Sequence, residues 1–85
     1  MQTYDLAIAW CWEYDSDFVQ QIDAECGRRK ILSYLIHPHN LFETLQRMEK
    51  RELRFKIFFD RASDQEEAFD QLVAVMRDEG VKMIN

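Results

Sequence analysis

The sequence predicts an α/β fold, a three-layer α-β-α sandwich on a four-stranded parallel sheet of the Rossmann-like kind. Four short apolar segments alternate along the chain with three amphipathic segments, and this alternation is typical of parallel sheets covered by helices. The 85 residues are 47% hydrophobic and include only 2 Gly and 1 Pro. This composition excludes a disordered chain and predicts a single domain with a dense core.

The four apolar segments are the expected strands, and they cover residues 6–12, 31–36, 53–59 and 81–84. The first two are almost continuously apolar, as in strands buried on both faces. The third alternates, with Arg54 and Lys56 on one face, and the fourth carries Lys82. Because charged residues favour edge strands, we expect the strand order 3-2-1-4. The alternative is the flavodoxin-like order 2-1-3-4, which would place Arg54 and Lys56 inside the sheet.

The three amphipathic segments are the expected helices, and they cover residues 15–29, 40–50 and 63–80. Their apolar residues recur every three or four positions, which is helical spacing. We expect Gly27 and Gly80 to end the first and third helices. Polar residues followed three positions later by a glutamate predict capping boxes at two helix starts, namely Asn40 with Glu43 and Ser63 with Glu66.

Charge and cysteine content exclude several classes of protein. Lys plus Arg number 11 against 16 Asp plus Glu, so the net charge is -5, which disfavours binding to nucleic acid or to an anionic membrane. The longest apolar run, residues 6–12, is far shorter than the ~20 residues of a membrane span. The start has no basic leader, so secretion is not expected. Cys11 and Cys26 have no metal-like spacing, and we expect buried thiols in a cytoplasmic protein.

Ligands of open parallel sheets bind outside the carboxyl ends of the strands. The loops expected there supply seven candidate substrate-side residues: Glu13, Tyr14, Asp15, His37, His39, Asp60 and Arg61. The loop after the first strand is acidic and lacks glycine, which excludes a dinucleotide fingerprint, and no Walker loop is present. No catalytic residue and no metal site is expected from these motifs.

Two pairs among these candidates each allow two interpretations. His37 and His39, separated by a proline, could bind a metal with Asp60 or Glu13, or hold a carboxylate when protonated. The alternative is a rigid turn before a helix, which we favour because two histidines without a partnered motif are a weak signal. Asp60 and Arg61 could orient a substrate, or form a local ion pair of about 0–1 kcal/mol.

The arrangement also resembles a known family. Residues 4–23, YDLAIAWCWEYDSDFVQQID, and residues 53–64, LRFKIFFDRASD, look like the opening of an ATP-grasp enzyme. The chain resembles the N-terminal (pre-ATP-grasp) domain of the RimK-like and glutathione-synthetase-like ligases, which join a carboxylate to an amine or a thiol. The resemblance implies that residues 1–85 are one domain of a longer protein and help to form the substrate side of its cleft. It further implies that ATP and Mg²⁺ bind to the later domains, and it assigns no catalytic residue here.

The first functional hypothesis is therefore an accessory domain of an ATP-dependent ligase that is not catalytic alone, with the remaining domains as its partners. The second is a stand-alone interaction or dimerisation module that uses the edge of the fourth strand or an exposed apolar face. The third is a small acid–base enzyme that uses Glu13, His37 and Asp60.

Overall fold

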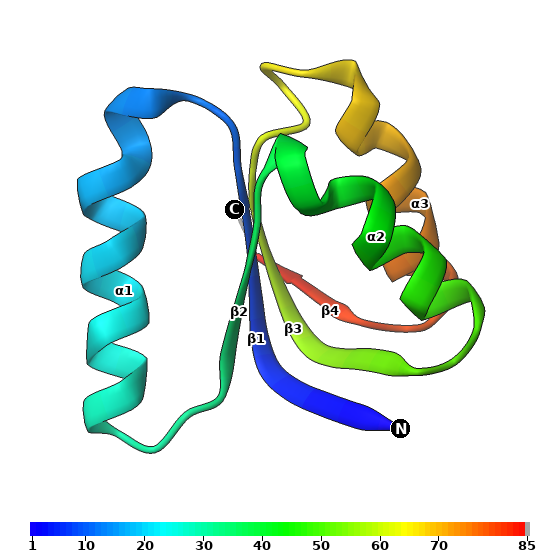
Figure 1. The fold of residues 1–85 in the computed structure, drawn as a ribbon, viewed down its shortest axis with the longest axis horizontal. Coiled ribbons are helices and arrows are strands. Elements are labelled where there is room, and N and C mark those ends of the chain that lie inside the picture. The colour runs from blue at the N-terminus through cyan, green and yellow to red at the C-terminus, as the bar shows by residue number, and fades with distance from the viewer. Residues whose placement is uncertain (85) are drawn as a thin grey trace.

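The computed structural model describes residues 1–84 and has the expected alternation of strands and helices. Its elements in chain order are β1 (Gln2–Trp10), η1 (Glu13–Asp15), α1 (Ser16–Arg28), β2 (Ser33–Ile36), α2 (Pro38–Glu49), β3 (Leu53–Arg61), η2 (Glu67–Phe69), α3 (Asp70–Asp78) and β4 (Lys82–Ile84). Helix α1 covers one face of the sheet, and α2 and α3 cover the other (Figure 1). The three-layer α/β class is confirmed.

The four strands are all parallel and lie in the order β2-β1-β3-β4. The first-ranked order 3-2-1-4 was wrong, and the alternative order 2-1-3-4 is the one observed. Strand β1 is central, because Leu6 is the register partner of Ser33 in β2 and of Ile57 in β3. Strand β3 therefore lies inside the sheet, with β4 at the edge.

The error came from the two charges of β3. Leu53 and Phe55 are buried while Arg54 and Lys56 are exposed, so the strand alternates strictly in this half. The first half of β3 bends away from α1 (Figure 1), and the charged side chains of Arg54 and Lys56 remain in water. Lys56 also pairs with Asp5 of the neighbouring strand, at 3.1 Å. A central strand tolerates these charges because one of its faces is only partly covered.

The main core lies between the sheet and the pair α2 and α3. Phe58 of β3, Phe69, Leu72 and Met76 are completely buried in it. Burying a side chain of this size contributes about 1.5–3 kcal/mol, so this layer accounts for much of the stability. The α1 side of the sheet has its own buried layer, which contains Ile8, Val19 and Cys26.

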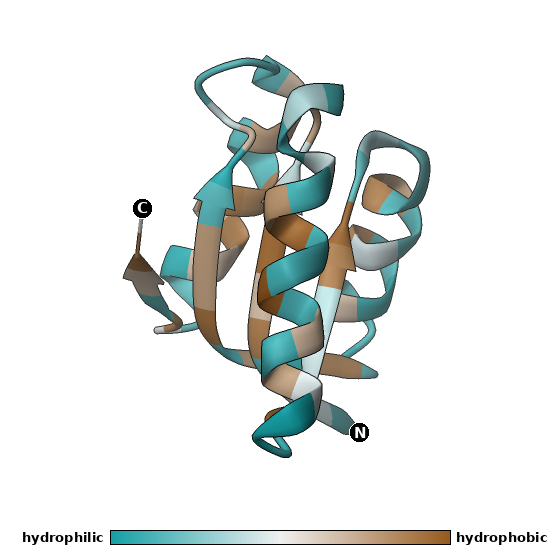
Figure 2. Ribbon diagram, turned by 90° about the vertical axis from the view of Figure 1, so that its left-hand side faces the viewer, coloured by the Kyte–Doolittle hydropathy of each residue, from teal (hydrophilic) through white to brown (hydrophobic). Residues whose placement is uncertain are grey.

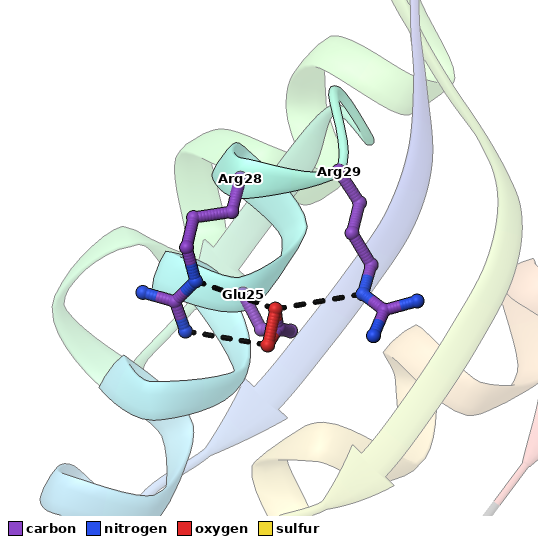
Figure 3. A network of polar contacts seen from close by, with 3 residues as sticks. All are labelled: Glu25, Arg28 and Arg29. Carbon is purple, nitrogen blue, oxygen red and sulfur yellow. Dashed lines mark hydrogen bonds and ion pairs between the residues drawn. The ribbon is translucent and has the colours of Figure 1, made fainter.

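The end of α1 carries an exposed ionic cluster (Figure 3). The carboxylate of Glu25 accepts two hydrogen bonds from Arg28, both at 3.3 Å, and pairs with Arg29 at 3.4 Å. The hydrogen bond and charge of Arg28 hold the pKa of Glu25 below its usual value. All three side chains are well exposed, so the cluster adds little stability.

Only one of the two predicted glycine stops is correct. Gly80 follows α3 with φ of 74°, the left-handed conformation that glycine adopts without strain. Gly27 lies inside α1, which continues to Arg28. The left-handed residue after α1 is Lys30, with φ of 59°.

Both predicted capping boxes were also wrong. Helix α2 begins earlier, at Pro38, with His37 as its N-cap. The Asn40 side chain accepts from the backbone N–H of His37 at 2.7 Å, so Asn40 closes the box rather than opening it. At α3, the Ser63 hydroxyl donates to Asp60 and does not cap the helix, while Glu66 accepts from the N–H of Ala68 at 3.4 Å.

Candidate functional site

The carboxyl ends of β1, β2 and β3 meet at one edge of the sheet, at the top of Figure 1. This is the edge at which ligands bind in open parallel sheets. A pocket of about 380 Å³ lies there, lined by Trp12, Asp15, Phe59, Asp60, Arg61, Ser63, Asp64 and Gln65. We use the term strand-end rim for the side chains of Trp12, Tyr14, Asp15, His37, His39, Asp60 and Arg61.

An ion pair between η1 and β3 forms one wall of the pocket. The Nη2 of Arg61 donates to Oδ1 of Asp15 at 2.8 Å, and this hydrogen bond raises the pKa of Arg61. The Asp15 side chain is only 11% exposed. The guanidinium also lies over the ring of Phe18, 4.8 Å from its centroid, an additional favourable contact for a cation.

Asp60 has a structural role in the turn after β3. Its Oδ1 accepts from the N–H groups of Ala62 and Ser63, each at 2.9 Å, and its Oδ2 accepts from the Ser63 hydroxyl. These are the bonds of an Asx turn. The predicted local ion pair between Asp60 and Arg61 does not form, because Arg61 reaches across to Asp15 instead.

The two histidines lie together at the start of α2. Their Nδ1 atoms are 2.6 Å apart, so one ring donates to the other, and the ring of His37 also packs against Trp10 at 4.5 Å between centroids. Burial, and then the charge of His39, lowers the pKa of His37, so the neutral form is favoured. Within residues 1–84 neither histidine bonds to Glu13 or Asp60, and no group of three potential ligands could hold a metal. The turn interpretation agrees with these contacts.

The aromatic part of the rim is open to solvent. Tyr14 is 73% exposed and Trp12 is 50% exposed, and their rings meet edge to face at 5.0 Å. Glu13 is exposed beside them. Five residues that line the pocket were not among the seven candidates, namely Trp12, Phe59, Ser63, Asp64 and Gln65. The position of Asp64 and Gln65 in the loop that follows β3 is the signal that could have pointed to them.

Both cysteines are free thiols, and the predicted burial is confirmed for Cys26 but not for Cys11. Cys26 is buried, and Cys11 is half-buried against the main core with its Sγ 3.9 Å from the carbonyl oxygen of Ala62. Burial is the main cause that raises the pKa of both thiols. Neither has the lowered pKa of a nucleophilic cysteine.

Comparison with known proteins adds no family or homologue to the description of this site. No family model, no curated protein and no solved structure matches this chain. In the part of the chain that the structure describes, no helix has the length and apolar character to cross a membrane.

Proposed function

We propose that this chain is an accessory domain of an ATP-dependent ligase that joins a carboxylate to an amine or a thiol. In this proposal the strand-end rim forms one wall of the substrate cleft, and the domain catalyses nothing alone in its cytoplasmic parent protein. The ligase class comes from the sequence resemblance, and ATP and Mg²⁺ would belong to other domains.

The observation that supports the accessory role is that the polar side chains of the rim bond to one another or to their own turn. Asp15 and Arg61 bond to each other, Asp60 bonds its own turn, and the rings of His37 and His39 bond together. Polar groups satisfied in this way hold a surface in shape rather than supply a free base or nucleophile. The exposed rings beside them offer area against which a substrate or another domain can pack.

The polypeptide that carries this sequence in its source cells provides the test. Purified and supplied with ATP, Mg²⁺ and mixtures of amino acids and thiols, it should release ADP only when a carboxylate and an acceptor are both present. Trp12→Ala and Tyr14→Ala should raise the KM for the acceptor or the carboxylate with kcat nearly unchanged. Phe42→Ala is the matched control, because Phe42 is as exposed as Tyr14, at 72% against 73%, but lies on α2. Absence of substrate-dependent ADP release, or equal effects at Phe42 and the rim, would refute the proposal.

A second candidate function is a stand-alone interaction or dimerisation module. The observation that favours it is exposed apolar surface, including Phe18 at 44% and Ile84 at 42%. This candidate predicts a native product that ends near residue 85 and an assembly whose size depends on concentration. Analytical ultracentrifugation of the 85-residue chain distinguishes it, since a strict monomer at high concentration counts against dimerisation.

A further inference from the structure

The charges of the chain are divided unevenly between the two ends of the sheet. The segments at the carboxyl end of the strands, residues 11–18, 37–40 and 60–70, contain eight carboxylates and a single guanidinium, so their formal charge is -7. The rest of the chain has eight carboxylates and ten Lys and Arg side chains and carries +2. Much of the ribbon at the carboxyl end, at the top of Figure 2, is hydrophilic. This end therefore has a negative potential, which favours cationic ligands.

The pocket of about 380 Å³ opens within this acidic end of the sheet. Trp12, which is half-exposed, and Phe59 supply its apolar lining. Asp15, Asp60 and Asp64 line the same pocket. The volume is that of a small-molecule site, and a cleft lined by charges of one sign concentrates counter-ions.

Two carboxylates of the pocket lack a full set of hydrogen-bond donors. Only 8% of the whole Asp15 residue is exposed. Its Oδ1 accepts from Arg61, but its Oδ2 has no partner among residues 1–84, although a carboxylate can accept about four hydrogen bonds. Asp64 is exposed and forms no ion pair in the same part of the chain. Because a buried carboxylate oxygen without a donor costs free energy, a ligand that brings N–H groups to Asp15 is favoured.

A thiol close to the pocket lies in the same negative field. Burial is the main cause that raises the pKa of Cys11, and the charges of Glu66, Asp64, Asp15 and Asp60 raise it further. The carboxylates therefore dominate the potential there, although the guanidinium of this end lies among them.

We propose that this pocket binds a small organic cation, namely an ammonium or guanidinium group on an apolar stem. The cation lies between Asp15 and Asp64, and its stem packs on Trp12 and Phe59, whose ring faces also attract a cation. Arg61 does not make the pocket a site for anions, because Asp15 already holds its guanidinium.

In the proposed ligase this cation is the amine substrate, and that identification rests on the proposed function. The binding itself does not, because it depends only on the residues of the pocket. It is therefore measured on the 85-residue chain without ATP.

Three ligands with the same ring and different charges test the inference. Benzylammonium, benzyl alcohol and benzoate are titrated separately into the ¹⁵N-labelled 85-residue chain at pH 7 and low ionic strength. Benzylammonium should shift the backbone amides of residues 12–16 and 59–65. It should bind about tenfold more tightly than benzyl alcohol, which lacks the charge, and benzoate should bind more weakly than either. Salt at about 0.5 M should weaken the binding of benzylammonium, because it screens the carboxylates.

Two single substitutions locate the site. Asp64→Asn should weaken benzylammonium by about tenfold. Asp78→Asn removes the same charge at an exposed position at the far end of α3 and should leave binding unchanged. Circular dichroism and thermal melts of both variants confirm that they are folded.

Four outcomes would overturn the inference. These are no binding of benzylammonium up to about 50 mM, equal binding of benzylammonium and benzyl alcohol, and equal weakening by Asp64→Asn and Asp78→Asn. The fourth is amide shifts confined to the groove of about 450 Å³ that Phe42, Leu45 and Val75 line with neighbouring residues. None of these outcomes changes whether the native polypeptide releases ADP, so failure of this inference and failure of the ligase proposal can be told apart.

Discussion

The ion pair between Asp15 and Arg61 should contribute measurably to stability, because one of its partners is buried. Arg61→Gln would leave the Asp15 carboxylate, 11% exposed, without the cation now 2.8 Å away. Loss of a partner by a largely buried charge costs about 2 kcal/mol after allowance for solvent at the guanidinium. For a domain of this size, that lowers Tm by about 8–16 °C.

A double-mutant cycle isolates the contribution of the pair. Arg61→Gln, Asp15→Asn and the double variant are melted by circular dichroism and unfolded in urea. A charge-assisted hydrogen bond is worth about 1.5–3 kcal/mol. Because the Arg61 side chain is 36% exposed, we expect a smaller coupling energy of about 1–1.5 kcal/mol. Glu25→Gln, which breaks the exposed cluster with Arg28 and Arg29, should leave Tm unchanged. A coupling energy below about 0.3 kcal/mol would refute the structural role of the pair and leave Arg61 free to bind substrate.

Three further predictions concern backbone, pH and thiol chemistry. Gly27→Ala should stabilise the protein by about 0.5–1 kcal/mol, because residue 27 is helical and a Cβ there meets open space. Gly80→Ala should destabilise the protein by about 1 kcal/mol, because the φ of Gly80 is 74°. Urea unfolding measures both changes. Folding lowers the pKa of His37. The contribution of His37 to stability is therefore present above its unfolded pKa of about 6.5 and is lost as the pH falls below that value. His37→Asn should reduce the loss of Tm between pH 7.5 and pH 5. Cys26 is buried with a raised pKa, so a disulfide reagent at pH 8 should label it far more slowly in the folded chain than in urea.

Different results would contradict each of these. The two glycine variants should change the free energy of unfolding in opposite directions. Destabilisation by both would show that α1 is not helical at Gly27. An unchanged pH slope in the His37 variant would show that its imidazole is not buried against Trp10. Labelling of Cys26 at the rate seen in urea would place the thiol in solvent.

The sequence predicted the class of fold because the class depends on hydrophobic periodicity, which is local. The sequence did not predict the strand order, since Arg54 and Lys56 indicate only that one face of β3 is exposed to solvent. That face can be exposed to solvent because β3 is an edge strand or because no helix covers it. Long-range packing decides between these two cases. The same limit applies to the helix starts, where Asn40 is a good cap by composition but His37 takes the position because Pro38 sets the first turn.

The meeting of the strand-end loops at one edge was predictable, but the contacts among their side chains were not. The loops after β1, β2 and β3 do meet at one edge, because the carboxyl ends of parallel strands share an edge. The partners within the site were not predictable, since Arg61 bonds Asp15, 46 positions away in the chain, rather than its neighbour Asp60. Contacts over such separations depend on register and strand order, and neither can be read from local spacing.

The mass of the native gene product in its source cells tests the ligase account most directly. An antibody against residues 1–85 would detect it in a cell extract, and mass spectrometry would measure it. The account predicts a polypeptide several-fold heavier than 10.3 kDa, in which this domain is joined to the parts that would bind ATP. A product of about 10.3 kDa would contradict it and would favour the stand-alone interaction module.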